Sequence, residues 1–147
     1  MAIRQATVTD REFLYELHCR TMRPVIDMTW GWDDEWQAKD FERRCATYDV
    51  FVIERDGHPI GGLMLETMAD SIYVHEIQVL PEYQEQGVGT AVMKQIIEQA
   101  SKRGLGVTLS VVAANPRAKD LYARLGFTVT AFESPFFRMR YSPTHLA

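Results

Sequence analysis

The stretch HEIQVLPEYQEQGVGT, residues 75–90, is the most informative part of the sequence, because it runs from an expected strand through a Gly-x-Gly turn into an expected helix. Such a turn leaves the first N–H groups of the helix without partners and sets the positive end of the helix dipole beside them. Glycines at 87 and 89 let the backbone approach an anion closely, since no side chain stands in the way. The stretch therefore predicts an anion site, typical of phosphate, at the start of the helix.

Other phosphate loops can be compared with the same residues. A Walker A loop needs Gly-Lys-Ser/Thr, but Gly89 is followed directly by Thr90. A dinucleotide-binding loop needs a third glycine where Val92 stands. Neither pattern fits. A plain strand-to-helix turn, whose glycines only relieve backbone strain, remains the alternative.

Outward from this stretch, the hydrophobic pattern predicts the element order βααβββαβαββ. The first helix should start at a Thr9–Glu12 capping box, and Pro24 and Gly31 should bound a connector after it. A meander followed by a crossover helix and a buried apolar strand predicts an α/β (α+β) fold with a mixed, mostly antiparallel sheet and helices on both faces. The expected strands are residues 3–7, 48–54, 59–68, 71–80, 107–113, 127–132 and 136–141, and the expected helices are residues 9–22, 34–45, 88–102 and 115–125.

Length, charge and cysteine content narrow the class of protein. A chain of 147 residues fits a single domain, residues 1–147. Its net charge of −4 has the wrong sign for binding nucleic acid by neutralising phosphates. Cys19 and Cys45 make no disulfide framework, so we expect both to be reduced. The N-terminus has no apolar signal region, and no run approaches the roughly 18 residues that span a bilayer. We expect a cytoplasmic protein with neither nucleic-acid nor membrane partners.

Two motifs give the chain a family resemblance. Gln84 to Gly89 matches a Gln/Arg-x-x-Gly-x-Gly/Ala element, and Asn115 to Phe127 matches Asn-x-x-Ala-x-x-x-Tyr-x-x-x-Gly-Phe. On these residues the sequence resembles the GCN5-related N-acetyltransferase (GNAT) superfamily. The resemblance is good for roughly residues 48–132, and the residues before them match only in outline. The resemblance implies the family's fold, in which two central parallel strands splay apart, acetyl-CoA as co-substrate, and no metal.

The resemblance also assigns residues to coenzyme A. The pantetheine arm would lie between the strands ending at Leu80 and Ala113, and the pyrophosphate would bind the backbone amides of Gln86 to Thr90. Asn115 would hydrogen-bond the pantetheine arm and also cap its helix. The residues assigned in this way are Ile77, Gln78, Val79, Gln84, Glu85, Gln86, Gly87, Val88, Gly89, Thr90, Asn115, Ala118, Lys119 and Tyr122.

The resemblance gives candidates for proton transfer. Tyr122 stands where the family often has the tyrosine that protonates the departing thiolate of CoA; the alternative is a core tyrosine, since residue 122 lies on an apolar helix face. Some members carry a Glu or His base where this chain has Ser110, which cannot be a strong base. The candidates for the base are therefore Tyr73 and His75, which share one face of their strand and would relay a proton through water. Glu76, on the other face, is either a second candidate or a solvent-facing or paired carboxylate.

Residues 28–36 contain all three tryptophans and three adjacent carboxylates. The carboxylates complement the positive end of the second helix, and the indoles cover the core or a subunit interface, which leaves a homodimer open. Alternatively Trp30, Trp32 and Asp33 form an aromatic, acidic wall for a cationic amine. We expect an N-acetyltransferase that acetylates a small-molecule or peptide amine; the alternative is a non-catalytic acyl-CoA-binding regulatory domain on the same fold.

Overall fold

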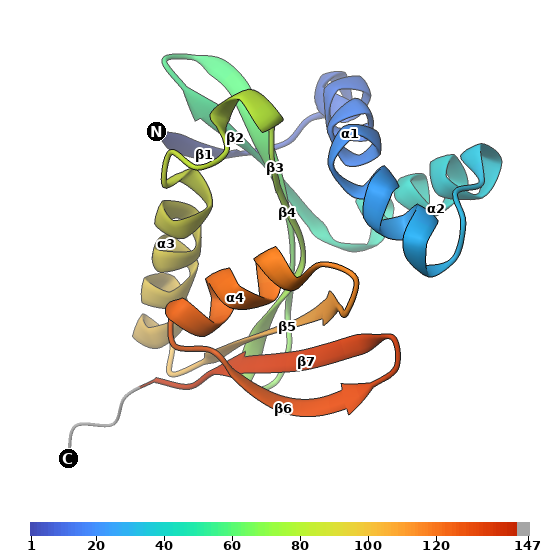
Figure 1. Ribbon diagram of the computed structural model, residues 1–147. Helices are drawn as coiled ribbons and strands as arrows, with labels where there is room; N and C mark the ends of the chain where they lie inside the picture. Colours follow the sequence, from blue (N-terminus) through green and yellow to red (C-terminus); the bar gives the residue numbers. More distant parts are fainter. Residues whose placement is uncertain (144–147) are drawn as a thin grey trace. The chain divides into compact units, whose positions relative to one another are not determined.

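The computed structural model describes residues 1–143 and shows a mixed α/β fold (Figure 1). Within this range there are four α-helices and a seven-stranded open sheet of order β1-β2-β3-β4-β5-β7-β6. The predicted element order is confirmed. The elements are β1 (Ala2–Gln5), η1 (Val8–Asp10), α1 (Arg11–Thr29), α2 (Asp34–Thr47), β2 (Asp49–Arg55), β3 (His58–Thr67), β4 (Ser71–Val79), η2 (Pro81–Tyr83), α3 (Val88–Lys102), β5 (Gly106–Val112), α4 (Pro116–Arg124), β6 (Thr128–Glu133) and β7 (Phe136–Tyr141).

Most strand pairs of the sheet are antiparallel, as predicted. β1 pairs with β2, β2 with β3, β5 with β7 and β6 with β7 in this way. β4 and β5 are parallel neighbours, with Ser71–Val74 opposite Gly106–Leu109. The apolar, β-branched run of β5 is buried at Val107 and Leu109, which agrees with its predicted place inside the sheet.

The chain forms two compact units. The first consists of Met1–Leu65 and Glu76–Gly89, and the second of Glu66–His75 and the chain from Thr90 onward. β4 therefore begins in the second unit and ends in the first. None of the helices within residues 1–143 is long and apolar enough to cross a membrane.

The core of the first unit joins α1 and α2 to β2 and β3. Leu14 of α1 and Phe41 of α2 pack with Val52 and Met64, and all four side chains are buried. A Cβ added at Gly62 of β3 would lie 2.6 Å from Leu14 Cδ2. A side chain at this position would therefore require the end of the Leu14 side chain to shift.

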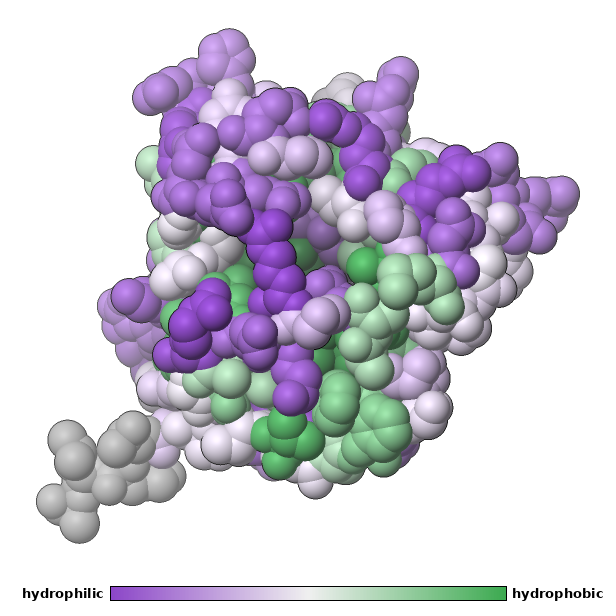
Figure 2. All heavy atoms as spheres, viewed as in Figure 1, coloured by the Kyte–Doolittle hydropathy of each residue, from purple (hydrophilic) through white to green (hydrophobic). Residues whose placement is uncertain are grey.

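The second unit has its own buried residues. α3 buries Val92, Ile96 and Ala100, the face that its 3.6-residue pattern predicts. On the β6–β7 hairpin, by contrast, Val129 and Phe132 are exposed, and Figure 2 shows hydrophobic atoms at the surface of this hairpin.

Helix α1 is longer than predicted. It continues past Met22 and through Pro24 to Thr29, so the expected connector begins only at Trp30. A proline inside a helix costs about 3 kcal/mol, because it removes a hydrogen bond and crowds the preceding turn. Continuing the helix buries Ile26. Burial of such a side chain contributes roughly 1.5–3 kcal/mol, which offsets much of the cost of the proline.

The start of α1 also differs from the prediction. The helix is preceded by η1, and the Thr7 N–H donates to Asp10 Oδ2 at 2.8 Å, in place of a Thr9–Glu12 box. The Asp10 carboxylate also accepts hydrogen bonds from both Nη atoms of Arg4, at 2.9 and 2.8 Å. These bonds to Arg4, reinforced by the Thr7 N–H, hold the pKa of Asp10 well below its usual range. Asp10, three residues after Thr7, therefore stabilises a helical start that comes before the predicted one.

Candidate active site

The predicted anion site falls on the loop between β4 and α3, residues 80–87. Glu85 and Gly87 have φ values of +62° and +78°. Left-handed residues set among ordinary ones are typical of backbone nests, in which successive N–H groups point toward one anion. A Cβ added at Gly87 would meet no atom within 4 Å, so space lies open in front of the backbone there. The loop can therefore accept an anion at the start of α3.

Side chains of the loop fold back onto its own backbone. Gln84 Nε2 donates to the Val79 carbonyl at 3.0 Å, and Gln86 Nε2 donates to the Glu82 carbonyl at 3.1 Å. The Leu80 N–H donates to the Ile60 carbonyl of β3 at 2.8 Å. These bonds fix the loop where it leaves β4, and Val88, the first residue of α3, is buried.

In the second unit, Tyr73 and His75 lie together on β4 as predicted. Their ring centroids are 4.5 Å apart. The Tyr73 hydroxyl lies 2.7 Å from Ser110 Oγ, which also accepts from Arg138 Nη1 at 3.2 Å. His75 Nε2 lies 2.9 Å from Glu66 Oε1. Ser110 thus joins a polar chain of Arg138, Ser110 and Tyr73 beside His75.

Helix α4 positions Asn115 and Tyr122. Asn115 is its N-cap, and the side-chain oxygen accepts from the Ala118 N–H at 3.2 Å. Tyr122 is buried, its ring centroid lies 5.8 Å from that of Phe127, and burial raises its pKa to about 12. A phenol with that pKa keeps its proton at neutral pH. Lys119 Nζ lies 4.6 Å from the Phe137 ring centroid.

A buried polar network in the first unit centres on Glu76. His18 Nδ1 lies 2.6 Å from Glu76 Oε1, and Arg44 Nη1 donates to Glu76 Oε2 at 3.5 Å. On its other side, His18 Nε2 lies 2.9 Å from Gln37 Oε1. Burial opposes ionisation of Glu76, but His18 and Arg44 outweigh it, so the pKa of this carboxyl is lowered. Glu76 is therefore an ionised, paired carboxylate.

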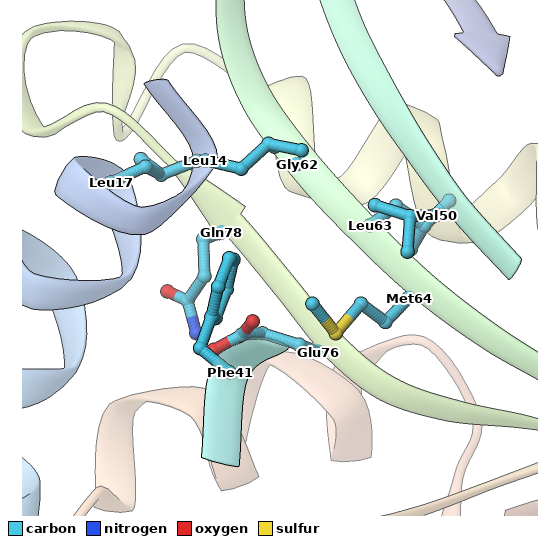
Figure 3. Close-up of a pocket in the computed structure, with 9 residues that line it drawn as sticks. All are labelled: Leu14, Leu17, Phe41, Val50, Gly62, Leu63, Met64, Glu76 and Gln78. Atoms are coloured by element: carbon cyan, nitrogen blue, oxygen red, sulfur yellow. The ribbon is translucent and has the colours of Figure 1, made fainter. Parts of the chain in front are cut away.

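Sequence reasoning missed three members of this network, His18, Gln37 and Arg44. The one available signal was the position of His18, directly after Leu17 on the apolar side of α1. A small pocket of about 10 Å³ next to the network has Glu76 and Gln78 as its polar wall, and both lie beside Phe41 (Figure 3). It is large enough for about one water molecule and is far smaller than a substrate site of several hundred Å³.

The connector between α1 and α2 is organised by its carboxylates. Asp33 caps α2, since its Oδ1 accepts from the Trp36 N–H at 2.9 Å, as the dipole interpretation predicts. The Trp32 indole donates to Asp34 Oδ1 at 2.7 Å, with the His18 ring 5.8 Å away and the Arg23 guanidinium 5.4 Å from its centroid. Trp30 is 57% exposed. The protein's own Arg23 thus occupies a cation position over Trp32.

Metal-binding side chains do not gather in the described part of the chain. Among residues 1–143, no group of three or more His, Cys, Asp and Glu side chains is placed to hold a metal ion. Cys19 and Cys45 are free thiols, and burial raises the pKa of Cys45.

Comparison with known proteins gives concordant matches. The model of the acetyltransferase (GNAT) family matches residues 11–127. The ribosomal protein bS18-alanine N-acetyltransferase of Escherichia coli K12 is 31% identical over 111 residues, which cover 74% of this chain and 72% of that protein. The thialysine N-epsilon-acetyltransferase of Bos taurus is 42% identical over 57 residues, 38% of this chain and 34% of that protein.

Solved structures share the fold. The PaiA N-acetyltransferase of Thermoplasma acidophilum in complex with coenzyme A superposes with a TM-score of 0.78 at 18% identity, covering 97% of this chain and 98% of that one. The ribosomal-protein-S18-alanine N-acetyltransferase of Escherichia coli gives a TM-score of 0.73 at 22% identity, with coverage of 99% and 96%.

Proposed function

Because the chain belongs to the GNAT family of acetyltransferases, we propose that it transfers the acetyl group of acetyl-CoA to a primary amine by direct attack in a ternary complex. The observation that carries the proposal is the loop before α3, with its left-handed residues at 85 and 87 and open space before Gly87. Relatives named as N-acetyltransferases of a protein alanine and of thialysine support an amine acceptor.

The residues of the loop before α3 fit coenzyme A. The backbone amides of Gln86 to Thr90 hold the pyrophosphate at the positive end of α3, with Gln84 beside it. Asn115 hydrogen-bonds the pantetheine arm in addition to its capping role. Acetyl-CoA supplies the thioester. The family match spans residues of both compact units, which supports a single acetyltransferase domain over residues 1–147.

In the reaction, the amine nitrogen attacks the thioester carbonyl carbon, a C–N bond forms, and the C–S bond breaks. Tyr122 donates a hydrogen bond to the sulfur as negative charge develops there. Because its pKa of about 12 exceeds the ordinary thiol value of about 8.5, the phenol is present in its protonated form but a complete proton transfer is uphill. Its main contribution is therefore stabilisation of the leaving thiolate, which takes up a proton from solvent, where His75 in turn releases the proton that it received from the amine.

The proton lost by the amine passes through water to His75, with Tyr73 as the second member of the relay. His75 Nε2 lies 2.9 Å from Glu66 Oε1, and this contact orients the ring. Glu76 is the less favoured base, since its two oxygens are engaged by His18 and Arg44. The role of Glu76 is to pair with His18 and Arg44.

The acceptor is a small primary amine, cationic before reaction, that meets the segment of residues 28–36. Trp30 offers an exposed indole and Asp33 a negative charge, both suited to an ammonium group. Trp32 lines the same wall, but Arg23 already occupies the cation position over its ring. A homodimer and a cytoplasmic location stay predictions.

A panel of acceptors tests the proposed function. Polyamines, aminoglycosides, amino acids and peptides are incubated with acetyl-CoA, with neutral alcohols and N-acetylated amines as matched non-cationic acceptors, and free thiol is measured. We expect thiol release with at least one cationic amine and none above background with the alcohols. Tight acetyl-CoA binding without turnover for any amine would instead support a non-catalytic acyl-CoA-binding domain.

A further inference from the structure

The proposed phosphate loop has an unfavourable charge for its ligand. From Pro81 to Thr90 the chain contains two carboxylates, Glu82 and Glu85, and no Lys or Arg. The diphosphate of coenzyme A carries two negative charges of its own at neutral pH. Backbone amides and a helix dipole supply only partial charges, so a cationic side chain from outside the loop would add to the attraction for the diphosphate.

Two arginines of the first unit reach the loop. Arg20 of α1 donates to Glu82 Oε1 at 2.6 Å, and this hydrogen bond lowers the pKa of Glu82. Arg20 is therefore already paired with one of the loop's own carboxylates. Arg55, the last residue of β2, reaches the loop from the β2–β3 hairpin.

Arg55 makes no ion pair with its neighbours in the loop. Its Nη1 donates to Gln86 Oε1 at 2.8 Å, and its guanidinium carbon lies 5.8 Å from the Tyr83 ring centroid. Both contacts are with uncharged groups, and no carboxylate within residues 1–143 forms a salt bridge with it. The guanidinium has five N–H donors, and the bond to Gln86 uses one of them. Figure 2 shows mainly hydrophilic atoms over this hairpin and the loop.

We propose that Arg55 binds the diphosphate of coenzyme A and supplies the positive charge that the loop lacks. The inference rests on the proposed function, which places the diphosphate on the amides of Gln86 to Thr90. Gln86 holds one side of the guanidinium and Tyr83 covers it, so the remaining N–H groups form a preset fork for phosphate oxygens. The cation thus comes from a hairpin about 30 residues before the loop.

The test measures binding of coenzyme A, dephospho-coenzyme A and pantetheine by calorimetry at low and moderate salt. The variants are Arg55→Gln, Arg55→Lys and the control Arg43→Gln, whose guanidinium pairs with Asp40 on the same helix. We expect Arg55→Gln to raise the Kd for coenzyme A roughly tenfold or more and to flatten its salt dependence. Pantetheine, which has no phosphate, should bind all variants alike, and Arg55→Lys should recover part of the loss.

The outcomes separate this inference from the proposed function. If the wild-type protein fails to bind coenzyme A, the proposed function and the inference about Arg55 are both wrong. If it binds and Arg55→Gln matches Arg43→Gln, only the inference is overturned. If the loss in Arg55→Gln disappears with dephospho-coenzyme A, Arg55 pairs with the 3′-phosphate and the diphosphate assignment is wrong. Unequal pantetheine affinities would show that the substitution acts on the fold of the site instead of on charge, which also overturns it.

Discussion

His18 Nδ1 and Glu76 Oε1 lie 2.6 Å apart, and the two side chains are 3% and 10% exposed. The pair joins α1 to β4 across 58 residues of sequence, near the end of the strand that leads into the proposed phosphate loop. A buried carboxylate at this place is stabilised only while its partners are present, because desolvation alone would favour its neutral form.

We predict that Glu76→Gln lowers the free energy of unfolding by about 3 kcal/mol at pH 7, since it leaves Arg44 without its buried counter-charge and His18 without its carboxylate partner. Because the pKa of Glu76 is lowered in the folded state, its contribution is present above the ordinary value of 4.5 and lost as pH falls below it. The variant should therefore lose less stability than the wild type on acidification below pH 4.5.

Urea unfolding across this pH range measures the effect, with Glu98→Gln as the control. Glu98 pairs with Lys102 on an exposed helix face, so its replacement should change stability by less than about 1 kcal/mol. Equal stability of the two variants at pH 7 would contradict the structural role of Glu76.

Tyr122→Phe should reduce kcat about 100-fold while the Kd for acetyl-CoA stays within a few-fold of the wild type. The substitution keeps the ring against Phe127 and removes only the donor to the leaving sulfur. Tyr15→Phe is the matched control, since Tyr15 is a phenol of the first unit whose pKa burial also raises to about 12. An unchanged kcat in Tyr122→Phe would show that the hydroxyl has no part in the chemistry.

His75→Ala should lower kcat/KM chiefly at acidic to neutral pH, because the remaining reaction depends on the fraction of free amine. Its pH profile should then follow the ionisation of the acceptor, with a midpoint near 10 for a lysine-like amine. Profiles of the variant and the wild type that superpose after scaling would leave His75 with a structural role beside Tyr73.

Gly87→Ala should weaken coenzyme A binding several-fold, because the new methyl group occupies the open space before the loop backbone. Gly104→Ala is the control: its φ of +71° resembles the +78° of Gly87, and its Cβ also meets nothing within 4 Å. Both variants should lose about 1 kcal/mol of stability from the left-handed backbone. If both bind coenzyme A equally well, Gly87 is not at the anion site.

Local signals account for what could be predicted from the sequence. Asn115 before Pro116 predicts the start of α4, and the side chain does cap that helix. The Gly-x-Gly turn predicts the strand-to-helix loop, and Gly87 is left-handed there. These features depend on a few adjacent residues, so spacing and residue type are enough to reveal them.

Other features depend on packing between distant segments. The link of His18 to Glu76 and that of Arg55 to Gln86 join elements 58 and 31 residues apart, and no pattern in either element specifies its partner. The extension of α1 through Pro24 likewise depends on burying Ile26, which local propensity opposes. Tertiary contacts decide these cases.

Titration calorimetry of the purified protein with acetyl-CoA tests whether the chain binds this co-substrate. We predict saturable binding to one site per chain with a Kd below the millimolar range, weakened by added salt because phosphate charge contributes to affinity. Absence of binding up to millimolar acetyl-CoA, in protein shown to be folded by its cooperative thermal unfolding, would contradict the account.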